Sequence, residues 1–194
     1  MKEEEEIAWL ASLTAEKRER LKAVMTPVEL DKGETLVREG SVDDRLYFLT
    51  EGIVRAFRSG DEESTLWFAT KGDIVLSSWG YMCGEASKIS IVAECDCTLY
   101  RIEKEDVERL SGEDAETANF FRHHIEKLYM EVEEWMLNMM EPSAEKRYLY
   151  IVREKPELIA TVKLKDIASY IYLRPQSLSR IRSRIAKKRG SEEK

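Results

Sequence analysis

Residues Leu164 to Arg189 read LKDIASYIYLRPQSLSRIRSRIAKKR. The first part of this stretch places apolar residues at helical spacing, and Pro175 then stands where the first turn of a second helix tolerates a proline. Ala168 is small enough to let two helices cross closely. Three apolar residues, three and four positions apart, predict the buried side of the second helix: Leu178, Ile181 and Ile185. The stretch therefore predicts a helix-turn-helix.

Basic residues dominate the second helix. Between Arg174 and Gly190 the sequence has seven Lys or Arg residues and no acid, a charge pattern typical of a phosphate-binding helix. From Pro142 onward there are 14 Lys and Arg against 6 Asp and Glu, a balance of +8, whereas the preceding residues carry 17 against 32, a balance of −15. An acidic body repels DNA and a basic tail attracts it, so charge would orient the protein on a duplex. The alternative is a solvated amphipathic helix that binds nothing.

Composition excludes several other classes of protein. A chain of 194 residues, 43% hydrophobic, can bury a core and is expected to form two units. No apolar run approaches the roughly 20 residues of a membrane span, and the start MKEEEE has no signal-peptide features, so we expect a cytoplasmic protein that does not contact a membrane. We expect no metal site and no cofactor, because the cysteines lack metal-ligand spacing and adjacent helical histidines rarely share a metal. These residues are Cys83, Cys95, Cys97, His123 and His124.

The hydrophobic periodicity of the sequence changes along its length. Residues 3–25 read as helical with a break near Thr14, and short alternating runs broken by glycines follow from Pro27 to Ile102. Short strands separated by turn residues are typical of an antiparallel sandwich or jelly roll. The clearest predicted strands are Leu46–Thr50, Ile53–Arg58, Thr65–Thr70 and Ile89–Ile102.

A long helix should follow, opened by a capping box of Ser111 with Asp114 and ended at Glu141 by Pro142. Its apolar residues are spaced at a 3.5-residue period, which favours a parallel two-stranded seam between two copies over packing on its own domain. They are Phe121, Ile125, Leu128, Val132, Trp135 and Met139. Beyond a hinge at Glu141–Ser143, we expect a helix over Ala144–Glu154 and a short extended piece over Ile159–Val162.

In this order the chain resembles the cyclic AMP receptor protein and fumarate–nitrate regulator (Crp/Fnr) family of bacterial transcription factors. The segments that carry the resemblance are DKGETLVREGSVDDRLYFLTEGIVRAF (Asp31–Phe57), LWFATKGDIV (Leu66–Val75), AEKRYLYIVREKPEL (Ala144–Leu158) and KDIASYI with SLSRIR (within Lys165–Arg182). The resemblance implies an α+β fold: a cyclic-nucleotide-binding-like β jelly-roll barrel (1–112), a dimerisation helix (113–141) and a winged-helix-like helix-turn-helix domain (142–194).

The resemblance also implies a function and its residues. The family's base-reading positions fall on Gln176 and Arg180, which can pair with the edges of adenine and guanine. Phosphate contacts would come from Ser177, Ser179, Arg182, Arg184 and Lys187. The helix 175–188 of each copy in a homodimer would then read one half of a palindromic operator in double-stranded DNA. RNA polymerase is the further partner that the family implies.

The ligand cassette departs from the family's pattern. The stretch LSSWGYMCGEASKISIVA (Leu76–Ala93) contains no arginine to hold a cyclic phosphate, so we expect an effector other than cyclic AMP. The candidate effector pocket comprises Ser77, Ser78, Trp79, Gly84, Glu85, Ser87 and Lys88. Trp79, Tyr81 and Met82 either line an apolar pocket or fill the barrel. In the DNA-binding part, Tyr172 stands where the family often has a turn glycine, and little sequence remains for a wing.

Two other classes of function are alternatives to a transcriptional regulator. A nucleotide-binding-like signalling module could dock a protein through its basic tail, although an acidic partner would have to resemble DNA in charge. Jelly-roll barrels also host metal-dependent oxygenases, which need a histidine and carboxylate cluster. The region from Pro27 to Ile102 has no histidine, so we expect a protein that is not an enzyme.

Overall fold

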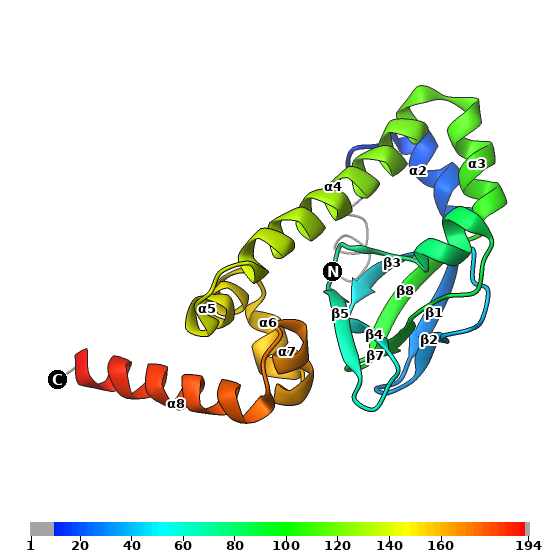
Figure 1. Ribbon diagram of the computed structural model, residues 1–194. Coiled ribbons are helices and arrows are strands. Elements are labelled where there is room, and N and C mark those ends of the chain that lie inside the picture. Colours follow the sequence, from blue (N-terminus) through cyan, green and yellow to red (C-terminus); the bar gives the residue numbers. More distant parts are fainter. Residues whose placement is uncertain (1–9, 193–194) are drawn as a thin grey trace.

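Two antiparallel four-stranded sheets form the first half of the chain. The computed structural model describes residues 10–192, with side chains described as far as Lys188. One sheet has the strand order β1-β8-β3-β6 and the other β2-β7-β4-β5, and they face each other as a sandwich (Figure 1). The strands are β1 (Thr26–Leu30), β2 (Thr35–Val37), β3 (Leu46–Glu51), β4 (Val54–Arg58), β5 (Ser64–Ala69), β6 (Ile74–Val75), β7 (Ser90–Ala93) and β8 (Cys97–Ile102).

The sandwich has the apolar interior that the alternating sequence predicts. Val54 on β4 and Leu99 on β8 are fully buried at 0% exposure, as are Leu49 and Ile91 on the strands beside them. One prediction was wrong: the run Ile89–Ile102 is two strands in different sheets, β7 and β8, because the chain turns at Glu94–Asp96. The alternation continues through the corner, so the sequence alone reads as one strand.

Three helices surround one end of the sandwich. They are α2 (Ala15–Lys22), α3 (Lys104–Glu113) and α4 (Ala115–Met139). The predicted break near Thr14 is confirmed, since Thr14 is the N-cap of α2; the rest of the predicted helix before residue 10 lies outside the described residues. The predicted capping box was wrong in its first residue: Ser111 lies inside α3, and Asp114 itself caps α4 by accepting a 2.9 Å hydrogen bond from the backbone N–H of Thr117.

Helix α4 spans 25 residues, about 37 Å at 1.5 Å per residue, and joins the sandwich to the C-terminal helices (Figure 1). The residues predicted to form a seam between two copies pack largely within the chain. Phe121, Ile125 and Leu128 lie against the sandwich, while Trp135 and Met139 pack with the C-terminal helices. Val132, at 42% exposure, is the member of the six that faces solvent. The apolar residues at 3.5-residue spacing therefore make two different contacts within one chain, with the sandwich and with the C-terminal helices.

Four helices complete the chain. They are α5 (Ala144–Glu154), α6 (Pro156–Thr161), α7 (Leu164–Tyr170) and α8 (Pro175–Glu192). The predicted extended piece at Ile159–Val162 was wrong, because Pro156 starts a short helix there and Leu158 anchors it in the core. The sequence left open whether a wing follows the second helix of the helix-turn-helix; α8 continues to Glu192, and no strand follows it within residues 10–192.

Candidate nucleic-acid interface

The turn between α7 and α8 brings the two helices into the predicted helix-turn-helix arrangement. The N–H of Leu173 donates to the carbonyl of Ala168 at 2.8 Å, and the N–H of Ser177 donates to the carbonyl of Arg174 at 3.0 Å. Tyr172 has φ of 55°, the left-handed conformation that glycine adopts more easily. Ala168 is fully buried where α7 meets α8. The small side chain and the tight turn therefore place the start of α8 beside α7.

Helix α8 presents two sides of different character. Leu178 and Ile181 are buried in the core of the C-terminal helices, and Ile185 packs against it. The predicted base-reading residues Gln176 and Arg180 are exposed, as are the phosphate candidates of the same turns, Ser177 and Ser179. The first turn of the helix contains no acidic residue. The structure thus places the four candidates on the solvent side of one helix, with a positive N-terminal dipole end available to phosphate.

The more distant phosphate candidates also lie on the exposed surface of α8. Arg182 and Lys187 are exposed on α8. Arg184 is also exposed, but its Nη2 lies 2.5 Å from Oε2 of Glu145 on α5, and Nζ of Lys188 lies 3.6 Å from the other oxygen of that carboxylate. Glu145 would therefore compete with a phosphate for Arg184.

The predicted effector residues do not converge on one space. Ser77 is fully buried and its hydroxyl accepts a hydrogen bond from the N–H of Gly80 at 3.3 Å, while the hydroxyl of buried Ser87 donates to the carbonyl of Ile89 at 2.8 Å. The remaining polar candidates are exposed, and Gly84 adopts φ of 67° at the end of the five-residue π-helix Trp79–Cys83. The exposed polar candidates are Ser78, Glu85 and Lys88.

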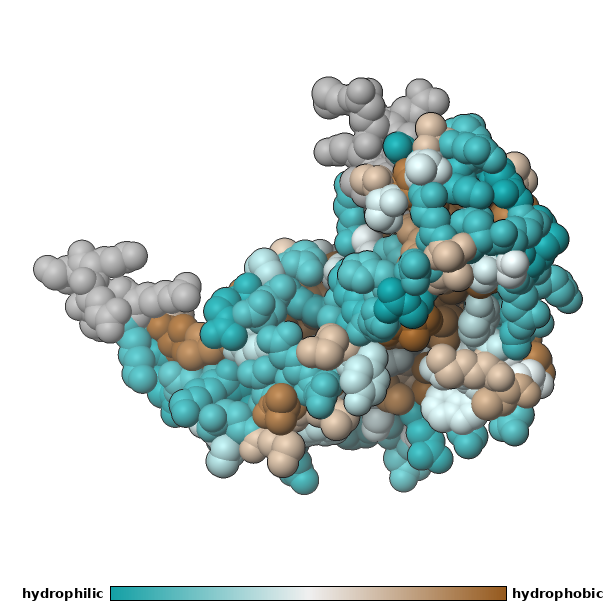
Figure 2. Space-filling view, turned by 90° about the horizontal axis from the view of Figure 1, so that it is seen from above, coloured by the Kyte–Doolittle hydropathy of each residue, from teal (hydrophilic) through white to brown (hydrophobic). Residues whose placement is uncertain are grey.

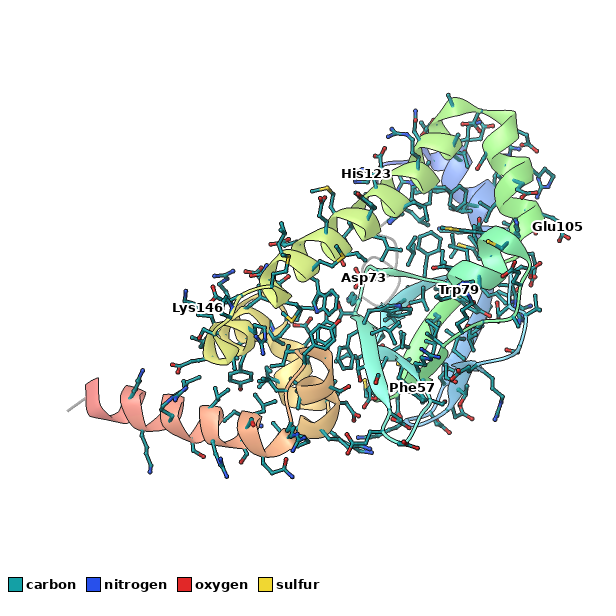
Figure 3. The ribbon with its side chains drawn as sticks, in the orientation of Figure 1. Phe57, Asp73, Trp79, Glu105, His123 and Lys146 are labelled. Carbon is teal, nitrogen blue, oxygen red and sulfur yellow. The ribbon has the colours of Figure 1, made fainter. Side chains whose placement is uncertain are left out.

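Trp79 fills space in the sandwich. Its ring packs against the core of the two sheets (Figure 3). Nζ of Lys88 lies 5.1 Å from the ring centroid. Tyr81 packs toward the helices, whereas Met82 is 59% exposed. The backbone next to Trp79 is fixed by close packing, because a Cβ at Gly80 would meet the carbonyl oxygen of Asp43 at 1.9 Å.

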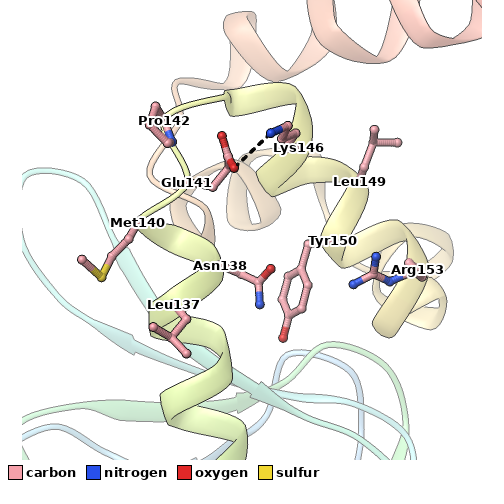
Figure 4. Close-up of a pocket in the computed structure, with 9 residues that line it drawn as sticks. All are labelled: Leu137, Asn138, Met140, Glu141, Pro142, Lys146, Leu149, Tyr150 and Arg153. Atoms are coloured by element: carbon pink, nitrogen blue, oxygen red, sulfur yellow. Dashed lines mark hydrogen bonds and ion pairs between the residues drawn. The ribbon is translucent and has the colours of Figure 1, made fainter.

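A cavity of about 610 Å³ lies between the end of α4 and helix α5 (Figure 4). It combines apolar side chains with charged ones on its rim, including Lys146 paired to Glu141 at 3.3 Å. The apolar wall continues along α4, where large hydrophobic side chains are exposed. The face of the molecule seen in Figure 2 is mainly hydrophilic, with scattered apolar patches. The exposed large hydrophobic residues of α4 and its C-cap are Tyr129, Met130, Val132, Met136, Leu137 and Met140. This row shares only Val132 with the predicted seam and faces away from the chain's own core.

A buried charged cluster, which no sequence motif indicates, lies beneath the helix-turn-helix. Arg55 of β4 lies between Glu94, Asp166 of α7 and Glu63, with the three paired distances at 2.6, 3.6 and 2.9 Å. Arg55, Glu94 and Asp166 have side chains only 6–7% exposed. Burial raises the pKa of the Asp166 carboxyl, and the charge of Arg55 opposes that rise. The cluster joins residues far apart in the sequence, which a linear pattern does not reveal.

The sandwich matches a known domain. Residues 27–114 match the cyclic nucleotide-binding domain family. This part of the chain is a cyclic nucleotide-binding domain. The Crp/Fnr resemblance is borne out at the level of fold, because solved structures of regulators align over most of the chain at low identity. FixK2 from Bradyrhizobium japonicum aligns with a TM-score of 0.71 and 20% identity, over 85% of this chain and 86% of that one.

Two further structures extend the same likeness beyond the cyclic nucleotide-binding domain. CLP of Xanthomonas campestris, a c-di-GMP responsive global regulator, aligns with a TM-score of 0.71 and 15% identity, over 90% of this chain and 93% of that one. A Eubacterium rectale protein assigned to the Crp/Fnr family aligns with a TM-score of 0.65 and 19% identity, over 90% and 84%. No curated protein matches the sequence. These identities establish a shared fold.

Two general features of the described chain bear on the function classes. No group of three or more His, Cys, Asp or Glu side chains within residues 10–188 is arranged to hold a metal ion. Across the helices that the structure describes, none combines the length and the apolarity needed to cross a membrane.

Proposed function

We propose that the protein is a homodimeric transcriptional regulator that binds a palindromic operator in double-stranded DNA through α8 of each copy. The observation that carries the proposal is the exposed row Gln176, Ser177, Ser179 and Arg180, held by buried Leu178 on the second helix of a helix-turn-helix. Arg and Gln are suited to paired hydrogen bonds with guanine and adenine, and serine hydroxyls to phosphate. Regulators of the same fold support this reading. Such a protein would act in the cytoplasm, where RNA polymerase would be a further partner.

The dimer would form through the exposed apolar row on α4. Met136, Leu137 and Met140 stand at the end of the helix nearest the DNA-binding helices, and Tyr129 continues the row toward the sandwich. Large apolar patches on a soluble protein mark interaction sites. Two copies related by a two-fold axis would present their α8 helices to successive major grooves, about 34 Å apart.

The proposed effector is not cyclic AMP. No arginine occurs from Leu76 to Ala93, and Ser87 is already hydrogen-bonded to its own loop. A buried cyclic phosphate would lose a charge-assisted pair, about 1.5–3 kcal/mol of binding energy. Trp79 also occupies part of the space next to the sandwich core.

Selection of operators from random duplex DNA, with and without added cyclic AMP at fixed salt, tests these proposals. We expect one palindrome to be recovered equally in both conditions. Recovery of a palindrome only with cyclic AMP would overturn the proposal that the effector is not cyclic AMP. The proposal of a transcriptional regulator would still stand. No enriched palindrome would favour the second candidate, a signalling module that docks a protein through the basic tail, and Arg180→Ala would then leave that docking intact.

A further inference from the structure

The DNA-binding helices are attached to an edge of the cyclic nucleotide-binding domain. Strand β5 is the last strand of its sheet, so one side of its backbone has no strand partner. Helix α7 lies along that side (Figure 1). The hydroxyl of Ser169 accepts a hydrogen bond from the N–H of Thr65 at 2.9 Å and contacts the carbonyl of Glu63 at 3.3 Å. A single serine of α7 thus satisfies one backbone group of the edge strand and one of the residue just before that strand.

Buried charges reinforce this contact. Nε of Arg55 donates to Glu94 at 2.6 Å, both within the cyclic nucleotide-binding domain, and Nη1 lies 3.6 Å from the carboxylate of Asp166 on α7. Separation of α7 from β5 would leave Arg55 with less negative charge around it and would bring Asp166 into water. Since a buried charge is stable only when it is paired, the cluster favours the attached arrangement over partial separation.

Aromatic side chains continue the contact on its apolar side. Phe68 of β5 meets Tyr170 of α7 edge to face, with ring centroids 5.1 Å apart, and Tyr170 stacks on Trp135 of α4 at 5.4 Å. Phe68 and Ile53 of the sandwich belong to the same buried cluster as the C-terminal helices. The contact therefore combines backbone hydrogen bonds, a buried ionic cluster and stacked rings.

The attached arrangement has an electrostatic consequence for DNA. The turn between β4 and β5 carries Asp61, Glu62 and Glu63, all exposed, and Glu63 lies beside Ser169 of α7. In helix-turn-helix proteins the first helix crosses the DNA backbone while the second enters the groove. Glu63 is paired with Arg55, so the carboxylates of Asp61 and Glu62 would repel the phosphates that the first helix approaches.

We propose that Arg55, Asp166 and Ser169 form an inhibitory latch, which holds the helix-turn-helix against β5 and keeps the acidic β4–β5 turn next to the DNA-binding surface. This proposal rests on DNA binding as the proposed function. Release of α7 from β5 moves the acidic turn away from α7 and raises DNA affinity. The latch assigns a role to Arg55 and Asp166 outside any effector pocket.

The first experiment compares Asp166→Asn with the wild type. The substitution keeps the size of the side chain but removes its charge from Arg55. We expect affinity for duplex DNA, measured by fluorescence anisotropy, to rise at least threefold. Hydrogen exchange at the Thr65 amide, which donates to Ser169, should accelerate in the absence of DNA. Glu157→Gln is the matched control, because it removes one exposed carboxylate from the same group of helices, away from the cluster; both measurements should stay close to wild type.

A double-mutant cycle tests whether the acidic turn is the inhibiting element. The pair Asp61→Asn with Glu62→Gln should raise DNA affinity in the wild-type background and have little effect once Asp166→Asn has released α7. Ser169→Ala provides a second route to release, since it removes both backbone contacts and leaves all charges in place. It should reproduce the exchange and affinity changes of Asp166→Asn even if that variant is poorly folded.

The outcomes separate the latch from the proposed function. Faster Thr65 exchange with unchanged or weaker DNA binding in both release variants would overturn the inhibitory role, as would additive effects in the cycle. Unchanged exchange in both variants would show that the cluster does not hold α7. If no variant binds any duplex, DNA binding as the proposed function fails and the inhibitory role fails with it, while the exchange data still report whether Ser169 and Asp166 attach the helices.

Discussion

Trp135 of α4 stacks on Tyr170 of α7 with ring centroids 5.4 Å apart and ring planes inclined by 18°. The same indole also lies 5.8 Å from the ring of Tyr172 in the turn that precedes α8. The long helix thus touches both the first helix of the helix-turn-helix and its turn through one side chain. A shift of α4 would be transmitted directly to the position of α8.

Trp135→Ala should therefore lower the free energy of unfolding by about 2–4 kcal/mol, because it removes a large ring from a packed aromatic group. Urea denaturation followed by circular dichroism measures this change. Glu133→Ala, an exposed neighbour on the same helix, is the control and should change stability by less than about 0.5 kcal/mol. A loss below about 1 kcal/mol for Trp135→Ala would contradict the stacking contact.

Arg180→Ala should reduce operator affinity by about 1–3 kcal/mol and relax preference at one base position in each half-site. Arg182→Ala should instead weaken binding to all duplexes alike and reduce the slope of log affinity against log salt by about 1. Anisotropy titrations at several salt concentrations, on the operator and on variants with one base pair changed, distinguish the two behaviours. If Arg180→Ala lowered the affinity for every duplex equally, Arg180 would not be a base-reading residue.

Acid should destabilise the protein through His124. Burial between Phe48 and Phe120, followed by the charge of Lys127, lowers the pKa of His124 to about 4, against 6.5 for the free side chain. The unfolded chain then binds a proton that the folded chain resists, so stability is retained above pH 6.5 and falls as pH decreases from 6.5 toward 4.

The loss should be of the order of 2 kcal/mol across that window, since one pKa unit corresponds to about 1.4 kcal/mol and the ring is partly solvated. Urea denaturation between pH 4 and 7 measures it. His124→Phe should flatten the dependence. His123→Gln, at the exposed neighbour on the outer side of α4, should change it only slightly, because the charge of His123 lowers the pKa of His124 less than burial and Lys127 do (Figure 3). An unchanged slope in His124→Phe would assign the dependence to other groups.

Substitutions at Tyr172 should separate backbone strain from side-chain contact. Asparagine tolerates φ of 55°, so Tyr172→Asn should be close to neutral in urea denaturation despite losing the ring contact with Trp135. Tyr172→Val should cost about 1–2 kcal/mol, because a branched side chain fits the left-handed conformation poorly. Equal stability of both variants would show that the turn does not depend on this residue.

Leu137→Asp should weaken the proposed dimer without unfolding the protomer, since Leu137 is 66% exposed and its replacement disturbs no buried contact. Sedimentation velocity over a range of concentrations would show a lower-mass species, with an unchanged circular dichroism spectrum. Glu134→Ala on the same helix is the control and should sediment as wild type. A wild-type protein that sediments as a protomer at all concentrations would argue against the dimer.

The sequence predicted local features well where burial and spacing coincide. Leu178, Ile181 and Ile185 place α8 correctly, because helix packing forces apolar residues to recur at three and four positions. The same logic failed along α4, where one regular spacing satisfies two different contacts of the same chain: Phe121 packs on the sandwich and Trp135 on the C-terminal helices.

Contacts between distant segments could not be predicted from local patterns. Arg55 and Asp166 each read as an ordinary polar residue of a strand or helix, and only the folded chain shows that they meet. The corner at Glu94–Asp96 was missed for a related reason, since Cys95 and Cys97 preserve an alternation that the change of sheet does not interrupt. Long-range pairing requires information that a single sequence does not contain.

The hydroxyl of Ser169 beside the backbone of β5 has a consequence for the cyclic nucleotide-binding domain when it stands by itself. A shortened chain that ends after α4 would leave the N–H of Thr65 and the carbonyl of Glu63 without their partner, together with the apolar rings of Phe68 and Ile53. Such an uncovered strand is a template for pairing with another chain. The helix-turn-helix thus also protects the cyclic nucleotide-binding domain from self-association. We expect that domain, when isolated, to aggregate through β5.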